Sequence, residues 1–359
     1  GVQRVALALD NGLEWALWDL ALLRAGLICV PLPGFFSPAQ QEHVLNHAGI
    51  DCLIGAGAPG FARVEGDIHR RSVAQPPELH VGTCKITYTS GTTGDPKGVL
   101  YSHRSVVLHA MAAGLSGAFG LSAFDCIMPC SSLYHGTAWG QPFAAAINGC
   151  KFVLPCDKMD GASLQELIKS EGVTFTHGVP TILQMLLNAA AAAKVDLHGL
   201  KMVIGGSALP KALAKQALEA GIDIFAGYGM SETGPLAAVS HVSSRDLSGD
   251  PAGEVEFRTR AGIAGPLVEL RIVDPDMKDI PHDGKSAGEI VLRAPWLTQG
   301  YYNNPEGSEQ LWAGGYLHTS DIAVISPGGH VHITDRIKDV IKTGGEWVSS
   351  LQIEDLISQ

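Results

Sequence analysis

Residues 86–100 carry the side chains whose types and spacing are best suited to chemistry. The centre of this stretch, residues 89–99, is rich in glycine and hydroxyl side chains and contains one lysine, with apolar residues on both sides. Small residues let backbone N–H groups approach an anion closely, hydroxyls add hydrogen-bond donors, and a lysine supplies a compact positive charge. The pattern therefore predicts a loop that binds the phosphates of a nucleotide, formed by Thr89, Ser90, Gly91, Thr92, Thr93, Gly94 and Lys97.

This loop is not of the Walker A type, which requires Gly-Lys followed by Ser or Thr. Here Pro96 precedes Lys97 and Gly98 follows it, which argues against a P-loop ATPase. Taken alone, the stretch is equally compatible with an exposed Gly/Thr loop. Other parts of the chain must therefore supply the rest of a nucleotide site.

Two further blocks follow predicted strands, and ligands bind at strand ends in layered α/β proteins. Gly205-Gly206-Ser207 presents bare backbone ahead of a helix, although alone it is more typical of an ordinary turn. In the block Tyr228-Gly229-Met230-Ser231-Glu232-Thr233, the tyrosine can stack on a purine and the serine can bond a phosphate oxygen. Glu232 supplies the hard oxygen ligand that Mg²⁺ prefers.

These blocks, in this order, resemble the AMP-forming acyl-CoA synthetases of the adenylate-forming superfamily. Residues 316–321 and 335–342 resemble the ribose-binding and hinge blocks of that family, and the resemblance runs through nearly all 359 residues. Residues 296–298, 300–302 and 344–347 resemble its medium- and long-chain fatty-acid branch. Ser231 stands where the family more often has threonine, and it keeps the hydroxyl.

The resemblance implies a role for each matching residue. Asp321 is expected to accept both ribose hydroxyls, Arg336 to contact the ribose, and Lys338 to be the pivot of a C-terminal domain. Mg²⁺ is expected at Thr89 and Glu232. The expected catalytic residues are Lys97, Glu232, Thr233 and Lys342, and the expected nucleotide contacts are the phosphate loop with Gly205, Gly206, Ser207, Tyr228, Gly229, Met230, Ser231, Glu232, Asp321 and Arg336.

The block at residues 133–140 matches a part of the family that lies beside the acyl group. His135 and Trp139, with Gly206 and Gly229, are therefore expected to form the wall of the carboxylate pocket. A single histidine after an aromatic residue is more often structural, and the chain has 14 histidines, so His135 is not assigned as a general base.

The implied reaction is ATP-dependent activation of a carboxylic acid to acyl-AMP and pyrophosphate, followed by displacement of AMP by the thiol of CoA. The chain begins inside the family's first domain and stops soon after the hinge, so the C-terminal domain with its adenylation lysine is expected to be missing. Two alternatives stay open within ligase chemistry: a ligase for aryl or sulfur-containing short acids, and an adenylation domain that serves a carrier protein. A third alternative is a nucleotide-binding fragment with little activity.

Strands and helices alternate along most of the chain, which predicts a layered α/β protein with largely parallel sheets flanked by helices. We expect an α/β body over residues 1–234, a β-rich subdomain over 235–334, and the hinge with the start of a further domain over 335–359. Residues 55–82 are predicted to be irregular. Helices are predicted at 13–25, 37–47, 105–119, 138–148, 163–170, 181–193 and 210–220, and late strands at 255–257, 268–273, 289–293 and in a hairpin at 323–334.

Composition limits the partners and the compartment. The net charge of −11 argues against a nucleic acid or an anionic membrane as a broad-surface partner. The seven cysteines are odd in number and form no C-x-x-C pair, so a reducing cytoplasm is expected. No run reaches transmembrane length. The expected partners are a small carboxylic acid, ATP and CoA, and a homodimer stays open.

Overall fold

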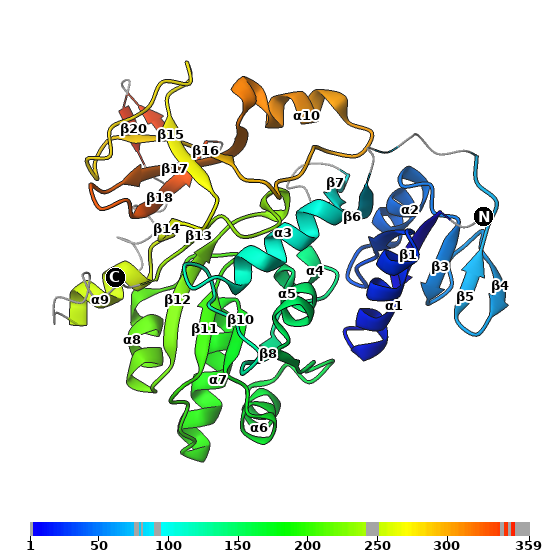
Figure 1. The fold of residues 1–359 in the computed structure, drawn as a ribbon, viewed down its shortest axis with the longest axis horizontal. Helices are drawn as coiled ribbons and strands as arrows, with labels where there is room; N and C mark the ends of the chain where they lie inside the picture. Colours follow the sequence, from blue (N-terminus) through cyan, green and yellow to red (C-terminus); the bar gives the residue numbers. More distant parts are fainter. Residues whose placement is uncertain are drawn as a thin grey trace.

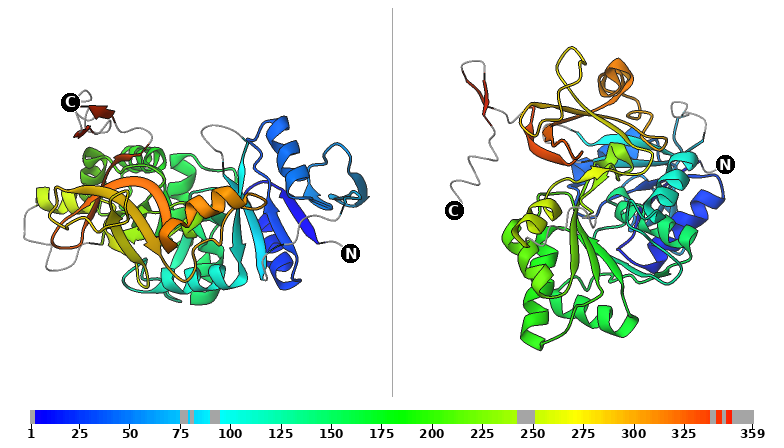
Figure 2. Two further views of the ribbon diagram at one scale, coloured as in Figure 1. Left: turned by 90° about the horizontal axis from the view of Figure 1, so that it is seen from above. Right: turned by 60° about the vertical axis from the view of Figure 1, so that its left-hand side comes forward.

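The computed structural model describes residues 3–74, 79, 82–89, 95–241, 251–337, 341–343 and 346–348. Four sheets follow one another along the described part of the chain: two large mixed sheets with helices packed on them, a smaller antiparallel sheet, and a separate two-stranded sheet of residues 341–343 and 346–348 (Figure 1). Figure 2 shows the N-terminal sheet at one end of the molecule and the third sheet toward the other. The predicted α/β class, with a smaller β part toward the C-terminus, is confirmed.

The first sheet has the strand order β4-β5-β3-β1-β2-β6-β7, and β1, β2, β3 and β6 form its parallel centre. Helices α1 (Leu13–Arg24) and α2 (Pro38–His47) lie in its crossovers. The Ser37 side chain accepts a hydrogen bond from the Gln40 backbone N–H and fixes the start of α2. The strands are β1 (Arg4–Ala8), β2 (Ile28–Pro31), β3 (Cys52–Gly55), β4 (Ala62–Glu65), β5 (Ile68–Arg70), β6 (Thr83–Thr89) and β7 (Lys97–Ser102).

The prediction that residues 55–82 are irregular is wrong, because β4 and β5 form an antiparallel hairpin there at the edge of the first sheet. All four residues of β4 are exposed. A strand that buries neither face lacks the alternation of apolar and polar residues by which a strand is identified from sequence.

The second sheet has the order β14-β13-β12-β11-β10-β8-β9, with a parallel centre and an antiparallel edge at β13 and β14. Its largest core cluster packs α6, α7 and α8 against the strands. The strands are β8 (Cys126–Pro129), β9 (Lys151–Phe152), β10 (Phe175–Gly178), β11 (Lys201–Ile204), β12 (Asp223–Tyr228), β13 (Ala238–Val239) and β14 (Ile263–Ala264). The helices are α3 (His103–Gly114), α4 (Gly136–Trp139), α5 (Gln141–Asn148), α6 (Gly161–Glu171), α7 (Pro180–Ala193) and α8 (Lys211–Glu219).

The helix predicted at 138–148 begins later than expected. Helix α5 starts at Gln141, and the preceding residues of α4 turn with positive φ angles, at Thr137 (φ 52°), Ala138 (φ 47°) and Trp139 (φ 57°). Non-glycine residues seldom adopt this left-handed conformation. Sequence patterns that assume right-handed helices therefore cannot detect the turn.

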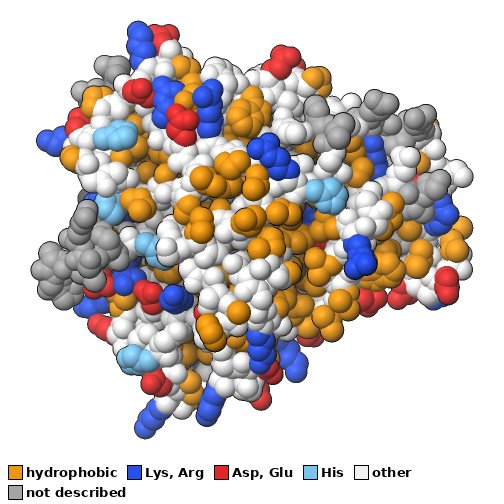
Figure 3. Space-filling view, viewed as in Figure 1, with side chains coloured by type: hydrophobic (Ala, Val, Ile, Leu, Met, Phe, Trp, Pro, Cys, Tyr) orange, Lys and Arg blue, Asp and Glu red, His pale blue; other side chains and the backbone are white. Residues whose placement is uncertain are grey.

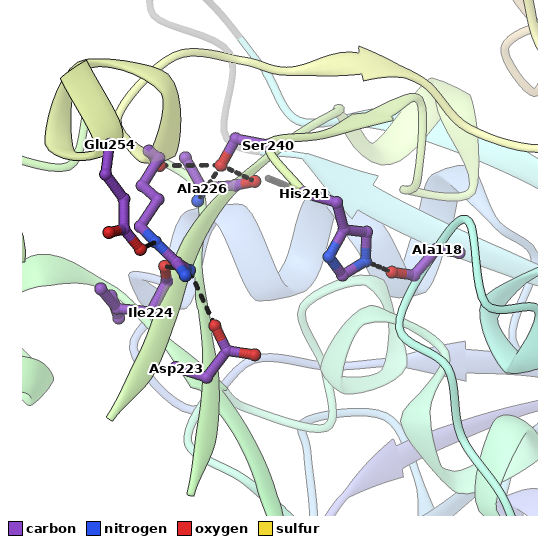
Figure 4. Close-up of polar contacts among 8 residues, drawn as sticks. Ala118, Asp223, Ile224, Ala226, Ser240, His241 and Glu254 are labelled. Carbon is purple, nitrogen blue, oxygen red and sulfur yellow. Dashed lines mark hydrogen bonds and ion pairs between the residues drawn. The ribbon is translucent and has the colours of Figure 1, made fainter. Parts of the chain in front are cut away.

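The strand predicted at 255–257 is wrong, because these residues lie in α9 (Pro251–Arg258). The alternating order Glu-Val-Glu-Phe imitates a strand, but Glu254 and Arg258 form an ion pair one helical turn apart. Arg258 also bonds Asp223, and Ser240 joins the backbone of Ala226 to that of Arg258 (Figure 4). These contacts fix α9 on the second sheet.

The third sheet is antiparallel, in the order β15-β16-β17-β18, and the hairpin predicted at 323–334 is confirmed with longer arms. Its turn holds Gly329 at a φ of 83°, which glycine adopts without strain. The elements are β15 (Glu269–Val273), β16 (Ala287–Arg293), α10 (Pro305–Leu311), β17 (Leu317–Ile325), β18 (Val331–Arg336), β19 (Ile341–Thr343) and β20 (Glu346–Val348).

Apolar side chains gather across the middle of one face, over α1 and α3 (Figure 3). The large apolar side chains that these two helices expose are Leu13, Leu17 and Leu20 of α1 and Val107 and Met111 of α3. Among the described residues, every helix is too short or too polar to span a bilayer.

Candidate functional site

One cavity of about 400 Å³ collects most of the described residues that the sequence predicts to be functional. It lies at the carboxyl ends of β11 and β12, where strands of a parallel sheet release ligand-binding loops. Its lining includes polar residues, among them Thr89, Tyr228, Ser231, Glu232 and Arg336. Its apolar part is formed by Phe119, Trp139, Val203 and Leu236, which pack together in one core cluster.

The predicted phosphate loop connects β6 to β7. These strands pair down to Thr89 and Lys97, so the two ends of the loop lie side by side. Thr89 lines the cavity, and Lys97 is exposed with its Nζ 5.2 Å from the centre of the Tyr301 ring. The predicted loop residues Ser90, Gly91, Thr92, Thr93 and Gly94 lie outside the described residues.

The block at the end of β12 folds into the short 3₁₀ helix η1 (Ser231–Thr233). Gly229 is required here, since a Cβ at this position would lie 1.5 Å from the backbone oxygen of Pro235. The Thr233 hydroxyl is fully buried, and it accepts a hydrogen bond from the Met230 N–H at 2.9 Å. Thr233 thus belongs to the framework of the loop and does not line the cavity, and its predicted catalytic role stays a prediction.

Glu232 is only 7% exposed, and its carboxylate faces Tyr301, for which the sequence predicts no role in the site. The Tyr301 hydroxyl donates to Oε1 of Glu232 at 2.7 Å. The same Tyr301 ring lies beneath the Lys97 ammonium, so one side chain contacts both the predicted phosphate-binding lysine and the predicted metal ligand. In the sequence, Tyr301 belongs only to a segment that resembles the medium- and long-chain fatty-acid branch of the family. No rule of sequence spacing connects it to residues 97 and 232.

The donor set around Glu232 suits Mg²⁺ bound together with a nucleotide. Within the described part of the chain, no three His, Cys, Asp or Glu side chains gather into a metal-binding group. Mg²⁺ in nucleotide sites is usually held by one or two carboxylates together with substrate phosphates. Glu232 and the Thr89 hydroxyl, both on the cavity wall, match that mode.

The predicted ribose contacts meet where β17 and β18 pair, because Asp321 lies opposite Arg336 in that pair. Arg336 Nε donates to Oδ1 of Asp321 at 3.1 Å, and the Tyr228 hydroxyl donates to Oδ2 at 2.7 Å. Burial raises the pKa of Asp321, although the hydrogen bonds from Tyr228 and Arg336 act in the opposite direction. Tyr228 and Arg336 line the same cavity as Glu232.

The glycine pair after β11 also lies on the cavity wall. Gly205 touches the indole of Trp139, where a Cβ would come within 2.9 Å of the ring, and Gly206 has a φ of 76°. Ser207 is exposed and does not line the cavity. Its predicted contact with the nucleotide stays a prediction.

The predicted acyl-pocket residues surround the apolar part of the cavity. Trp139 stacks on His177 with ring centres 4.2 Å apart, and His177 Nε2 lies 2.6 Å from the Ser131 hydroxyl. Desolvation lowers the pKa of His135, which keeps this wall uncharged at neutral pH. His109, a further lining residue, accepts a hydrogen bond from the Leu236 N–H at 3.2 Å.

Two buried histidines at this cavity should make the protein sensitive to acid. Burial lowers the pKa of His109 to about 4 and that of His177 to about 3, from 6.5. Their contribution to stability is complete above pH 6.5 and is lost as the pH falls toward these values, because the unfolded chain binds the protons first. Each histidine should lower the free energy of unfolding by about 1.4 kcal/mol per pH unit.

Urea unfolding at several pH values between 6.5 and 5 measures this slope. The variant His177→Gln should show about half of the slope that the two histidines produce in the wild type. An unchanged slope would mean that folding does not lower the pKa of His177.

The side chains of the two remaining predicted residues lie outside the described part. Lys338 is not described, and Lys342 is described only as a backbone position in β19. Their predicted roles as hinge and catalytic lysine stay predictions.

Comparison with known proteins places the chain in a family. The family model for AMP-binding enzymes matches residues 2–302. The chain is 42% identical to a long-chain-fatty-acid–CoA ligase of Thermus thermophilus over 76% of this chain and 51% of the relative. It is 40% identical to a 3-methylmercaptopropionyl-CoA ligase of Ruegeria lacuscaerulensis over 76% of this chain and 50% of the relative.

A solved structure shares the fold. The O-succinylbenzoate–CoA synthetase of Bacillus subtilis, in complex with ATP and magnesium ion, matches 99% of this chain and 74% of its own with a TM-score of 0.81 and 22% identity. The chain spans about half the length of the curated relatives it matches. Given the family match and the identity to these ligases, the chain belongs to the AMP-binding enzyme family.

Proposed function

We propose that this chain is the nucleotide- and acid-binding body of an ATP-dependent ligase that converts a fatty acid to acyl-AMP and then to acyl-CoA. The observation that carries the proposal is that one cavity is lined both by Glu232, Tyr228 and Arg336 and by the apolar residues around Trp139. A carboxylic acid with an apolar tail and a nucleotide could meet there.

In the first step, a carboxylate oxygen attacks the α-phosphorus of ATP, a new P–O bond forms, and the bond to pyrophosphate breaks. In the second, the CoA sulfur attacks the acyl carbon and AMP leaves with the electron pair of the broken C–O bond. Neither step requires a covalent intermediate on the protein. The task of the chain is therefore to hold the reactants in line and to neutralise the phosphate charge.

The predicted site residues receive the following roles in this proposal. Tyr228 and the backbone at Gly205 and Gly206 contact the adenine, Asp321 and Arg336 bind the ribose, and Ser231 bonds a phosphate oxygen. Lys97 and the loop from Thr89 to Gly94 bind the outer phosphates. Mg²⁺ would be held by Glu232 and Thr89, where it would supply positive charge to the phosphates. His135, Trp139, Gly206 and Gly229 face the acyl group.

The experiment that tests the proposal measures pyrophosphate release by the full-length protein with a panel of acids. The panel holds straight-chain acids of increasing length, 3-methylmercaptopropionate and an aryl acid. Release that depends on a straight-chain acid is the expected result. Nucleotide binding without release for any acid would contradict the proposal and favour a nucleotide-binding module.

A ligase for a short sulfur-containing acid is the second candidate. It is favoured by the 40% identity to the 3-methylmercaptopropionyl-CoA ligase. In the same panel, a preference for 3-methylmercaptopropionate over every fatty acid would select it.

We also propose a cytoplasmic location. The support is that all seven cysteines are free, including the exposed Cys156, which suits a reducing compartment.

The position of Tyr301 leads to a prediction about Mg²⁺ and ATP. Tyr301→Phe removes the hydroxyl bonded to Glu232 and keeps the ring beneath Lys97, so the Mg²⁺ concentration for half-maximal pyrophosphate release should rise about tenfold. Tyr301→Leu removes the ring as well, so the KM for ATP should also rise, by about two- to fivefold.

Tyr316→Phe is the matched control, because the Tyr316 hydroxyl bonds the Glu269 carboxylate at 2.6 Å on the exposed side of the third sheet. It should leave the Mg²⁺ dependence unchanged. Equal Mg²⁺ curves for Tyr301→Phe and the wild type would contradict the role of the hydroxyl.

A further inference from the structure

A buried ion pair lies behind the wall of the cavity. Lys85 on β6 and Asp19 on α1 form it, with Nζ and Oδ2 2.8 Å apart and both side chains only 1% exposed. The lysine is surrounded by aromatic rings, with Nζ 5.0 Å from the ring centre of Phe143 and 5.5 Å from that of Trp15. Burial and the neighbouring Asp19 carboxylate raise the pKa of the Cys29 thiol, so this thiol also faces the pair. Two full charges are therefore enclosed in an apolar core.

Stability does not explain this pair. Removing two charges from water carries a desolvation penalty that can exceed the energy gained from their attraction. Replacing such a pair by apolar side chains of similar volume is often neutral or stabilising. Lys85 also contacts a third group.

That group is the hydroxyl of Thr137, which lies 2.7 Å from Lys85 Nζ. Thr137 is part of α4, which is left-handed: φ is positive from Gly136 through Gly140. Left-handed backbone is costly for residues with a Cβ, and most of all for a β-branched residue such as threonine. Such a turn persists only where surrounding contacts determine it, and the bond from Lys85 is one of them.

The left-handed turn also carries one wall of the cavity. His135, Gly136 and Trp139 line the cavity, and the indole of Trp139 is held between His177, on which it stacks, and the bare backbone of Gly205. Ala138, between them, is fully buried in a core cluster with residues of β1 and α1. A turn that relaxed to the right-handed conformation would displace the indole, and the width of the apolar part would change.

We propose that Lys85 and Asp19 are positioning residues that hold the turn at Thr137 in its left-handed form and thereby set the size of acyl group that the cavity accepts. This inference rests on the proposed function. The strand that carries Lys85 also ends at Thr89, where the phosphate loop begins, so one strand positions the acyl wall and the start of the phosphate site.

The test uses three variants of the full-length protein. The double variant Lys85→Met with Asp19→Leu removes both charges and leaves neither one buried alone. Thr137→Val keeps the shape of the side chain and removes the hydroxyl, and Thr137→Ser keeps the hydroxyl. The readout is the ratio of kcat/KM for a long and a short straight-chain acid at saturating ATP, together with the KM for ATP.

We expect the double variant and Thr137→Val to change this ratio at least tenfold while the KM for ATP stays within twofold of the wild type. Thr137→Ser should retain the wild-type ratio. Thr174→Val is the matched control, because the Thr174 hydroxyl also bonds a charged side chain, donating to the Asp125 carboxylate at 2.8 Å, but Thr174 precedes β10 at the end away from the cavity. It should lower the melting temperature and leave the ratio unchanged.

A folded Thr137→Val variant with the wild-type ratio overturns the proposal, and so does a change in the KM for ATP without a change in the ratio. If no acid supports pyrophosphate release in the wild type, the proposed function fails instead. The inference is then still tested by calorimetric affinities for a long-chain and a short-chain acyl-AMP analogue, whose ratio should shift in the same variants.

Discussion

Glu232→Gln is expected to lower the rate of Mg²⁺-dependent pyrophosphate release by about 10²- to 10³-fold, the cost of losing one preorganised electrostatic contact in an active site. The amide keeps the shape of the carboxylate, and its carbonyl oxygen can still accept the hydrogen bond from Tyr301. The change therefore removes the charge that binds a hard cation and little else.

Single-turnover pyrophosphate release across a Mg²⁺ titration measures this effect. Glu219→Gln is the control, since Glu219 is an exposed residue of α8 whose ion pair with Lys215 spans 4.0 Å. Surface pairs of this kind contribute little to stability, so the control should behave as the wild type. Release by Glu232→Gln that equals the wild type at every Mg²⁺ concentration would remove Glu232 from the metal site.

Asp321→Asn is expected to weaken the binding of ATP and AMP by about 100-fold, because the amide is uncharged and keeps only one acceptor oxygen, whereas each hydrogen bond to a charged group contributes about 1.5–3 kcal/mol. In the proposed site the carboxylate accepts both ribose hydroxyls. The amide also leaves the Arg336 guanidinium without its anionic partner.

Calorimetric titration with ATP and with 2′-deoxy-ATP distinguishes this role from a general loss of structure. The wild type should bind ATP more tightly than the deoxynucleotide, and the variant should bind both equally. Because burial raises the pKa of Asp321, acid should weaken ATP binding in the wild type at a higher pH than for an exposed aspartate. Retained discrimination against the deoxynucleotide in the variant would exclude Asp321 as the ribose ligand.

The parts of the site that follow strands could be predicted from the sequence. Tyr228, Ser231 and Glu232 come directly after a short apolar run, and in a parallel sheet all such runs end at the same edge. The structure brings them to one cavity with Arg336, which is more than 100 residues away in the sequence. Motif order and strand polarity were sufficient for this result.

Contacts made across the fold could not be predicted in this way. Tyr301 reaches Glu232 because residues 298–302 cross over β7, where the Thr298 hydroxyl donates to the Leu100 carbonyl oxygen. The Thr137 hydroxyl, in the left-handed turn, accepts a hydrogen bond from a buried lysine 52 residues earlier. Periodicity and turn rules describe residues that are close together in the sequence. Both of these contacts join residues that are far apart in the sequence, so such rules cannot predict them.

The crossing segment also has a consequence for biosynthesis. Arg4 on the first strand donates to the Tyr302 hydroxyl at 2.7 Å, although the two residues are 298 positions apart, and Tyr302 packs in the core cluster of the N-terminal sheet with Val30, Leu53 and Leu100. That sheet therefore lacks a core residue until Tyr302 has left the ribosome. Domains usually fold from the N-terminus as they are synthesised, and incomplete cores expose apolar surface that aggregates. The first sheet of this protein, although made first, should be among the last parts to become resistant to proteolysis on the ribosome, and a truncated chain that ends before Tyr302 should require a chaperone to stay in solution.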